Sequence, residues 1–139
     1  MIVLTTKQYK QIITHCINSL PAEGCGLIGG VIKGQEKIIM KIYPLTNIDN
    51  SPEHFSMNPQ EQFDALKDIR NNGWILLGNF HSHPNSDAIP SKEDIRLAFD
   101  SNLSYLIVSL KNEKQPILKG YKIENSSTFE EEIQIVEGV

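Results

Sequence analysis

Residues 25–45 read CGLIGGVIKGQEKIIMKIYPL, two apolar segments on either side of a short polar turn. The first segment, residues 25–32, is small and apolar with paired glycines. The second, residues 37–45, is rich in the β-branched and aromatic side chains that favour strands. Lys33-Gly34 lies between them, and glycine there favours a tight turn. We therefore predict two strands paired as an antiparallel hairpin.

Helical patterns lie on both sides of this hairpin. Thr5 or Thr6 is a possible cap for a first helix, which Pro21 ends. Its apolar residues recur at helical spacing, and they are Tyr9, Ile12, Ile13, Cys16, Ile17 and Leu20. His15 lies off that stripe, so we expect it to be a solvated helix residue.

Further elements follow toward the C-terminus. Asn58-Pro59 is typical of a helix start, and this second helix ends at residues 71–73. A third helix begins at Ser91 and runs to about residue 99. The predicted strands comprise a brief one at 55–57, a major one at 74–83, and late ones at 105–110, 116–123 and 129–136. The pattern predicts an α/β fold, more closely an α+β mixed sheet flanked by helices.

Composition limits the kinds of protein this chain can be. Its 139 residues predict a single domain spanning 1–139. A net charge of −4 gives no electrostatic footprint for nucleic acid. The chain has no apolar run of the roughly 18–20 residues that a membrane span needs. Its first residues, MIVLT, lack the features of a secretory signal, so we expect a cytoplasmic protein. The oligomeric state is left open.

Cysteine usage points away from sulfur chemistry. Cys16 and Cys25 are too few for a disulfide framework and form no C-x-x-C motif. We expect Cys16 to be a small buried hydrophobic residue.

The candidate chemistry lies in residues 81–94, HSHPNSDAIPSKED. Because side chains alternate faces along a strand, His81 and His83 project from the same face. Pro84 ends that strand, and the following loop leads to Ser91 and Asp94, one helical turn apart. These side chains are therefore expected to meet where a strand end faces a helix start.

Two imidazoles and one carboxylate form a catalytic type of zinc site, because the fourth position stays free for water. Such a set also suits non-haem iron(II), and Asp87 and Glu93 are alternative carboxylates.

Two simpler interpretations compete with metal binding. The histidine pair can be a coincidence at a sheet edge. Ser91-x-x-Asp94 is nearly a helix capping box, in which the carboxylate is turned back to its own backbone amide.

Metal-activated water needs a proton acceptor, and Glu23 is a candidate. It precedes the glycine-rich strand that begins at Cys25, where small neighbours such as Gly24 and Gly26 leave space around it. The simpler interpretation is a solvated acid in a helix-to-strand turn. Spacing alone does not place Glu23 near His81.

These residues resemble the JAMM, or MPN-type, zinc metalloprotease family. The family pattern is a distant Glu, then His-x-His-Pro, six residues, Ser, two residues and Asp. This sequence matches it without departure, and residues 21–27, PAEGCGL, also follow the family context. The resemblance covers most of the chain and is to small prokaryotic members, with a cytidine-deaminase-like architecture. It implies Zn²⁺ bound by His81, His83 and Asp94, with Glu23 as general acid/base and Ser91 stabilising the oxyanion.

The resemblance also implies a substrate class. Family members cleave after the C-terminal glycines of ubiquitin or ubiquitin-like proteins, and small prokaryotic ones resemble enzymes that process sulfur-carrier proteins. We expect a zinc metallopeptidase or isopeptidase acting after the Gly-Gly tail of such a carrier. The alternative is a non-catalytic MPN scaffold that binds partners. A zinc deaminase would need H-x-E and P-C-x-x-C motifs, which the sequence lacks.

Overall fold

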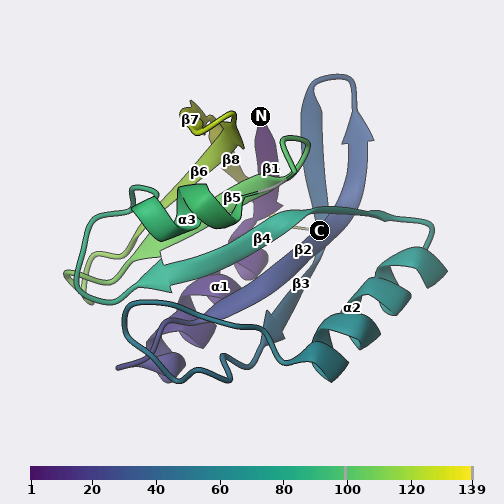
Figure 1. Cartoon of the computed structure of the whole chain (residues 1–139). Coiled ribbons are helices and arrows are strands. Elements are labelled where there is room, and N and C mark those ends of the chain that lie inside the picture. The colour runs from purple at the N-terminus through teal and green to yellow at the C-terminus, as the bar shows by residue number, and fades with distance from the viewer. Residues whose placement is uncertain (99, 139) are drawn as a thin grey trace.

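The computed structural model describes residues 1–98 and 100–138 as one mixed β-sheet with helices on both faces (Figure 1). Within these residues the strand order is β7-β6-β5-β4-β2-β3-β1-β8. The strands are β1 (Ile2–Thr5), β2 (Cys25–Lys33), β3 (Glu36–Leu45), β4 (Ile75–His83), β5 (Ser104–Ser109), β6 (Ile117–Glu124), β7 (Ser127–Glu131) and β8 (Ile133–Val136). The helices are α1 (Thr6–Ser19), α2 (Pro59–Asn71) and α3 (Lys92–Leu97). The predicted fold class is confirmed.

The predicted hairpin forms the centre of the sheet. β2 pairs with β3 in antiparallel register along its whole length, with an irregularity between Gly29 and Gly30. On its other side β2 pairs with β4, also antiparallel, and β4 pairs with β5 in parallel. β4 therefore has a strand on both sides, which fixes the direction of every side chain that it carries.

The helices divide between the two faces. α1 buries Ile12 and Cys16 in a core with Phe80 and Leu106. α2 packs Ala65 and Ile69 on a second cluster on the opposite face. Figure 1 shows α1 behind the sheet and α3 in front of it. None of the described helices is both long and apolar enough to cross a membrane.

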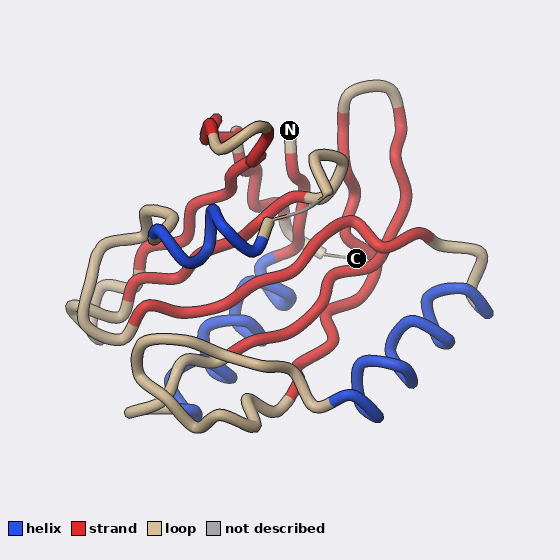
Figure 2. Tube along the Cα trace, in the orientation of Figure 1, coloured by secondary structure: helices blue, strands red, loops and turns tan. Residues whose placement is uncertain are grey.

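The predicted late strand at 129–136 is wrong, because two strands occupy that segment. β7 pairs antiparallel with β6 at one edge of the sheet, whereas β8 pairs in parallel with β1 at the other. Only Glu132 separates them, so the sheet must curl until its edges approach each other (Figure 2). β1 was not predicted as a strand, because four residues next to a helix carry little periodic signal.

The buried side chain of Lys37 spans the inside of this curl. It starts from β3, and its Nζ donates to the carbonyl oxygen of Asn102 at 2.6 Å and to Ser104 Oγ at 2.8 Å. Ser104 Oγ in turn donates to Glu131 of β7 at 2.6 Å. The network therefore connects strands that are far apart in the sheet order.

Three smaller predictions need correction. His15 is not solvated, because its Nε2 lies 3.0 Å from the carbonyl oxygen of Cys25 and 2.9 Å from that of Leu45. These carbonyls lie at the ends of β2 and β3, within reach of α1. The brief strand at 55–57 is only an isolated bridge between Asn47 and Met57. The third helix ends at Leu97, and its predicted end at residue 99 lies outside the described residues.

Gly78 offers a test of the close approach of β4 to β5. A Cβ at Gly78 would collide with the backbone carbonyl group of Ser104. We expect Gly78→Ala to lower the free energy of unfolding by about 2 kcal/mol or more, measured by urea denaturation. Gly34→Asn is the matched control, because its turn has φ +61° and open space around it. A cost below about 1 kcal/mol is expected there. Equal costs at the two sites would contradict this account.

Candidate metal centre

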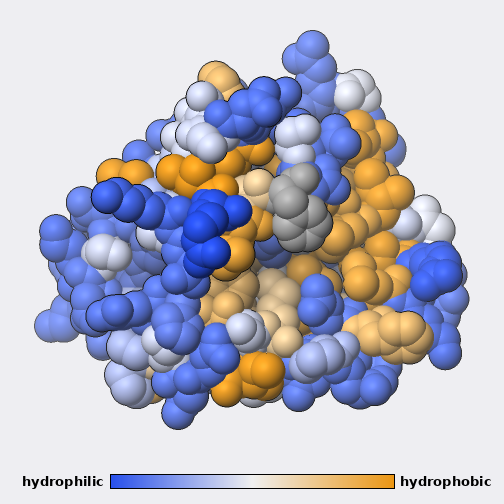
Figure 3. Space-filling model, viewed as in Figure 1, coloured by the Kyte–Doolittle hydropathy of each residue, from blue (hydrophilic) through white to orange (hydrophobic). Residues whose placement is uncertain are grey.

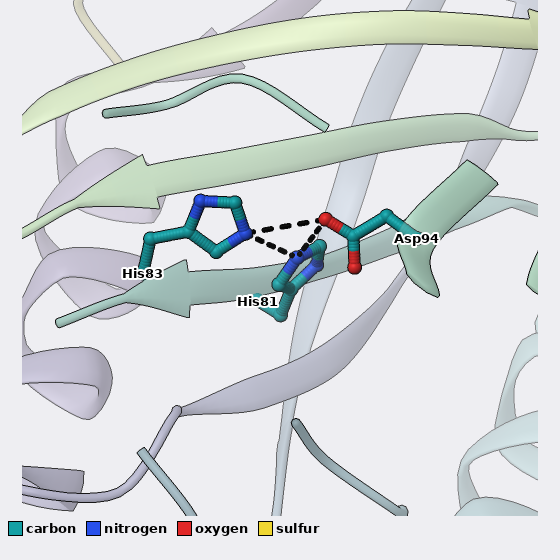
Figure 4. A group of neighbouring side chains, drawn as sticks. All are labelled: His81, His83 and Asp94. Carbon is teal, nitrogen blue, oxygen red and sulfur yellow. Dashed lines mark hydrogen bonds and ion pairs between the residues drawn. The ribbon is translucent and has the colours of Figure 1, made fainter. Parts of the chain in front are cut away.

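β4 carries the two histidines into a buried position at its C-terminal end. His81 and His83 are 2% and 5% exposed and lie on the face opposite α1. Their Nε2 atoms are 3.2 Å apart, and each lies 3.2 Å from Oδ2 of Asp94 (Figure 4). The three side chains predicted as ligands therefore converge on one point, with two supplied by β4 and one by α3.

The triangle of these three atoms has the size that a zinc ion requires. Ligand atoms about 2.0–2.1 Å from a tetrahedral zinc lie about 3.3 Å from each other. The observed separations of 3.2 Å match this value closely. Because three of four tetrahedral positions would be filled, one position would remain for water or substrate.

Hydrogen bonding prepares His83 for metal binding. Its Nδ1 donates to the carbonyl oxygen of Asp87 at 2.8 Å, so the lone pair of the neutral ring is on Nε2, which faces the triangle. Asp87 thus contributes its backbone, while its exposed carboxylate pairs with Lys111 at 3.5 Å. Neither Asp87 nor Glu93 belongs to the cluster that could hold a metal ion.

Asp94 completes the helix cap and also lies beside both histidines. Ser91 Oγ accepts from the Asp94 amide at 3.0 Å, and Asp94 Oδ2 accepts from the Ser91 amide at 2.9 Å, so the capping box is complete. The same Oδ2 also faces both Nε2 atoms. Capping therefore leaves Oδ2 directed at the two imidazoles, which is possible because a carboxylate oxygen has more than one lone pair.

The electrostatics of the cluster favour positive charge at its centre. Burial raises the pKa of Asp94, but hydrogen bonds from His81 and His83 outweigh it and hold the pKa well below its usual range. Burial also lowers the pKa of His83, but hydrogen bonds to Asp94 and to the Asp87 carbonyl more than compensate, so the pKa is raised. An ionised carboxylate that attracts a proton here also attracts a cation.

Strand register brings Glu23 to the same place. Cys25 pairs with His81 across β2 and β4. Beyond that pair, the Gly24 amide donates to Ser82 Oγ at 2.8 Å, and the Ser82 amide donates to the Gly24 carbonyl at 3.0 Å. Glu23 is only 4% exposed, which excludes the solvated acid that was the simpler interpretation.

The environment of Glu23 changes its acidity. Burial raises the pKa of Glu23 to about 8, with His83 opposing the shift and Asp94 adding to it. Because His83 and Asp94 both act on this carboxyl group, it lies within electrostatic range of the candidate metal cluster. Such a raised pKa brings a carboxyl group close to the neutral range in which a general acid/base works.

An apolar cavity of about 250 Å³ opens beside His81 and Asp94. Its lining includes Leu27 and Leu76 from the sheet and Leu97 from α3. Figure 3 shows apolar residues gathered at the centre of this face, with polar residues around them. The metal cluster therefore lies next to a hollow that can receive an uncharged part of a substrate.

Sequence reasoning missed one contact at the cluster. The ring of Phe55 stacks on His81 with 4.8 Å between ring centroids and 28° between planes. Phe55 belongs to the loop between β3 and α2, for which the sequence carries no periodic pattern. Nδ1 of His81 is buried and has no hydrogen-bond partner among the described residues.

Fold and site together define a hydrolase-type centre on a curled mixed sheet. The chain belongs to the family described as prokaryotic homologues of the JAB domain, whose family model matches residues 5–120. A JAB1/MPN domain protein from Archaeoglobus fulgidus, 21% identical, shares the fold with a TM-score of 0.61, covering 99% of this chain and 100% of its own. The resemblance to JAMM/MPN proteins is thereby confirmed.

Relatives match from four fifths to the whole of the chain. A CysO-cysteine peptidase of Mycobacterium tuberculosis is 26% identical over 137 residues, covering 99% of this chain and 92% of its own. A desampylase of Pyrococcus furiosus is 30% identical over 111 residues, covering 80% of this chain and 76% of its own. The solution structure of a protein from Desulfitobacterium hafniense is 51% identical with a TM-score of 0.91, covering 100% and 95%. The chain is a peptidase-type enzyme.

The raised pKa of Glu23 predicts a pH-dependent stability difference in metal-free protein. Its folded pKa of about 8 exceeds the ordinary value of 4.5, so its stabilising contribution is present at low pH and lost as pH rises through 8. Glu23→Gln resembles the protonated form at every pH. We therefore expect the variant to gain about 1–3 kcal/mol over wild type between pH 5 and pH 9, by urea denaturation with chelator. A difference that does not change with pH would contradict the assignment.

Proposed function

We propose that this enzyme is a zinc-dependent peptidase or isopeptidase that cleaves after the C-terminal Gly-Gly of a ubiquitin-like or sulfur-carrier protein. The observation that carries the proposal is the convergence of His81, His83 and Asp94 at 3.2 Å separations beside a buried Glu23.

The names of the relatives support the substrate class. CysO-cysteine peptidase and desampylase are names of enzymes that hydrolyse protein conjugates, and both align over most of this chain. The cavity beside the cluster is small, at about 250 Å³, which suits part of a flexible tail and not a folded surface. Such a tail ending in Gly-Gly has no side chains to hinder its approach to the buried centre.

Three residues would hold the metal and two would act on the substrate. A zinc ion bound by His81, His83 and Asp94 would supply Lewis acidity and a nucleophile from water near neutral pH. Glu23 would accept the proton of the attacking water and return it to the leaving amine. Ser91 would donate its hydroxyl hydrogen to the developing oxyanion, which it is free to do because its oxygen only accepts within the capping box.

Glu23→Gln and His81→Ala separate metal binding from catalysis. We expect Glu23→Gln to bind zinc stoichiometrically but to hydrolyse at most about 1% as fast as wild type, because proton transfer contributes about 10²–10⁴-fold. His81→Ala should lose both zinc and activity. The measurements are elemental analysis and intact mass of ubiquitin-like proteins extended beyond Gly-Gly, with and without chelator.

A matched control for Glu23 is Glu53→Gln, since Glu53 is an exposed acid in the neighbouring loop. It should keep wild-type activity. Full activity of Glu23→Gln would overturn the mechanism. A folded wild-type protein that binds no zinc would point to the non-catalytic scaffold.

Ser91 has a structural and a proposed catalytic role that substitutions can resolve. Ser91→Ala should lower kcat about 10²–10³-fold through the lost oxyanion donor, but lower stability by only about 1 kcal/mol through the lost cap. Ser91→Thr keeps a hydroxyl for both tasks and should retain most activity. If Ser91→Ala loses stability but keeps kcat, the residue is a cap alone.

A further inference from the structure

The loop of residues 46–58 connects β3 to α2 (Figure 2). The side chain of Asn47 makes four hydrogen bonds in and around this loop. Asn47 Oδ1 accepts from the amides of Asp49 and Ser56, each at 3.1 Å. Asn47 Nδ2 donates to the carbonyl oxygens of Glu23 and His54, also each at 3.1 Å. Two acceptor and two donor bonds use the full hydrogen-bonding capacity of a carboxamide. Three of the four bonds lie within the loop, and one leaves it.

The bond that leaves the loop reaches the backbone of Glu23. The carbonyl of Glu23 accepts from Asn47, while its amide donates to the carbonyl of Ser51 at 2.8 Å. The backbone of Glu23 is therefore held on both sides by the same loop. That loop also carries Phe55, whose ring stacks on His81.

We propose that Asn47 is a positioning residue that fixes Glu23 relative to the metal cluster by joining its backbone to the loop that packs on His81. The proposal rests on the proposed role of Glu23 as general acid/base. A proton acceptor must lie within hydrogen-bond reach of the attacking water, and small misplacements of such groups cost about 10²-fold in rate. The four hydrogen bonds of the Asn47 side chain go to Glu23, His54, Asp49 and Ser56 and not to His81, His83 or Asp94, so Asn47 acts through Glu23.

The role requires a side chain that both donates and accepts hydrogen bonds, so the variants are chosen to remove the donor alone or the whole carboxamide. Asn47→Asp preserves size and the Oδ1 acceptor but presents a carboxylate oxygen to two carbonyl oxygens. Asn47→Ala removes all four bonds. Ser56→Ala is the matched control, because it removes the 2.7 Å bond from Ser56 Oγ to Asp49 within the same loop and leaves the contact with Glu23 intact.

The first measurement is amide hydrogen exchange in metal-free protein, followed by NMR. We expect the Glu23 amide to exchange at least about tenfold faster in Asn47→Asp and Asn47→Ala, with amides of β4 unchanged. Ser56→Ala should change Glu23 exchange less than about threefold. This readout requires neither metal nor substrate.

The second measurement is steady-state kinetics of the zinc-loaded protein. Asn47→Asp should lower kcat about 10–100-fold while KM and zinc affinity stay within about threefold of wild type. Ser56→Ala should keep kcat within about threefold. Unchanged kcat or Glu23 exchange in Asn47→Asp would overturn the proposal. So would a loss of folding in both Asn47 variants, because the residue would then serve only the loop.

Failure of this inference is distinguishable from failure of the proposed function. If wild type hydrolyses the conjugates, Glu23→Gln does not, and Asn47→Asp matches wild type, only the role of Asn47 falls. If zinc-loaded wild type hydrolyses none of them, the proposed function falls and the catalytic role of Asn47 falls with it.

Discussion

The register between β2 and β4 is the constraint on which the centre depends. It sets Cys25 opposite His81 and thereby brings Glu23, two positions before Cys25, to the end of β4. Ser82 reinforces it with two hydrogen bonds to Gly24, at 2.8 and 3.0 Å. A slip of one residue would turn His81 and His83 to the opposite face, toward α1. The candidate metal cluster and the nearby position of Glu23 therefore both depend on one strand pairing.

Burying ionisable side chains lowers the free energy of unfolding unless hydrogen bonds compensate, and the two acids of the candidate site differ in this respect. A buried carboxylate is stable only when it is hydrogen-bonded or paired. Asp94 has its partners from the histidines and from the backbone at Ser91. Among the described residues the Glu23 carboxylate has no hydrogen-bond partner, and burial raises its pKa to about 8. These different surroundings keep Asp94 ionised, whereas Glu23 can exchange a proton near neutral pH.

Much of the fold and the residues of the candidate site could be predicted from sequence, because their signals are local. The hairpin at 25–45 and the strand ending at His83 are periodic apolar segments, and the spacing from His81 to Asp94 is fixed by one strand end and one helix start. The proximity of Glu23 could not be derived from spacing, since it depends on which strand pairs with β2. The resemblance to a family supplied that link.

Other features lacked any local signal. Asn47 and Phe55 lie in a loop whose structure comes from side-chain bonds and not from repetition. The division of residues 127–136 between opposite sheet edges depends on the curl of the whole sheet. At Asp94, the sequence spacing does not show that one carboxylate oxygen can complete the helix cap and still lie beside both imidazoles.

The pairing of β8 with β1 has a consequence for synthesis. β1 leaves the ribosome before β8, with all the other strands between them, yet the two are neighbours in parallel over four residue pairs. A nascent chain can form the central hairpin and even the pair of β2 with β4 long before this edge strand has its outer partner. Closure of the curl, with Glu132 accepting from the Ile2 amide at 2.8 Å, is therefore a late event that joins the two ends of the described chain. A chain that terminates near residue 130 would contain the residues of the candidate site but lack β8, so the β1 edge of its sheet would be uncovered.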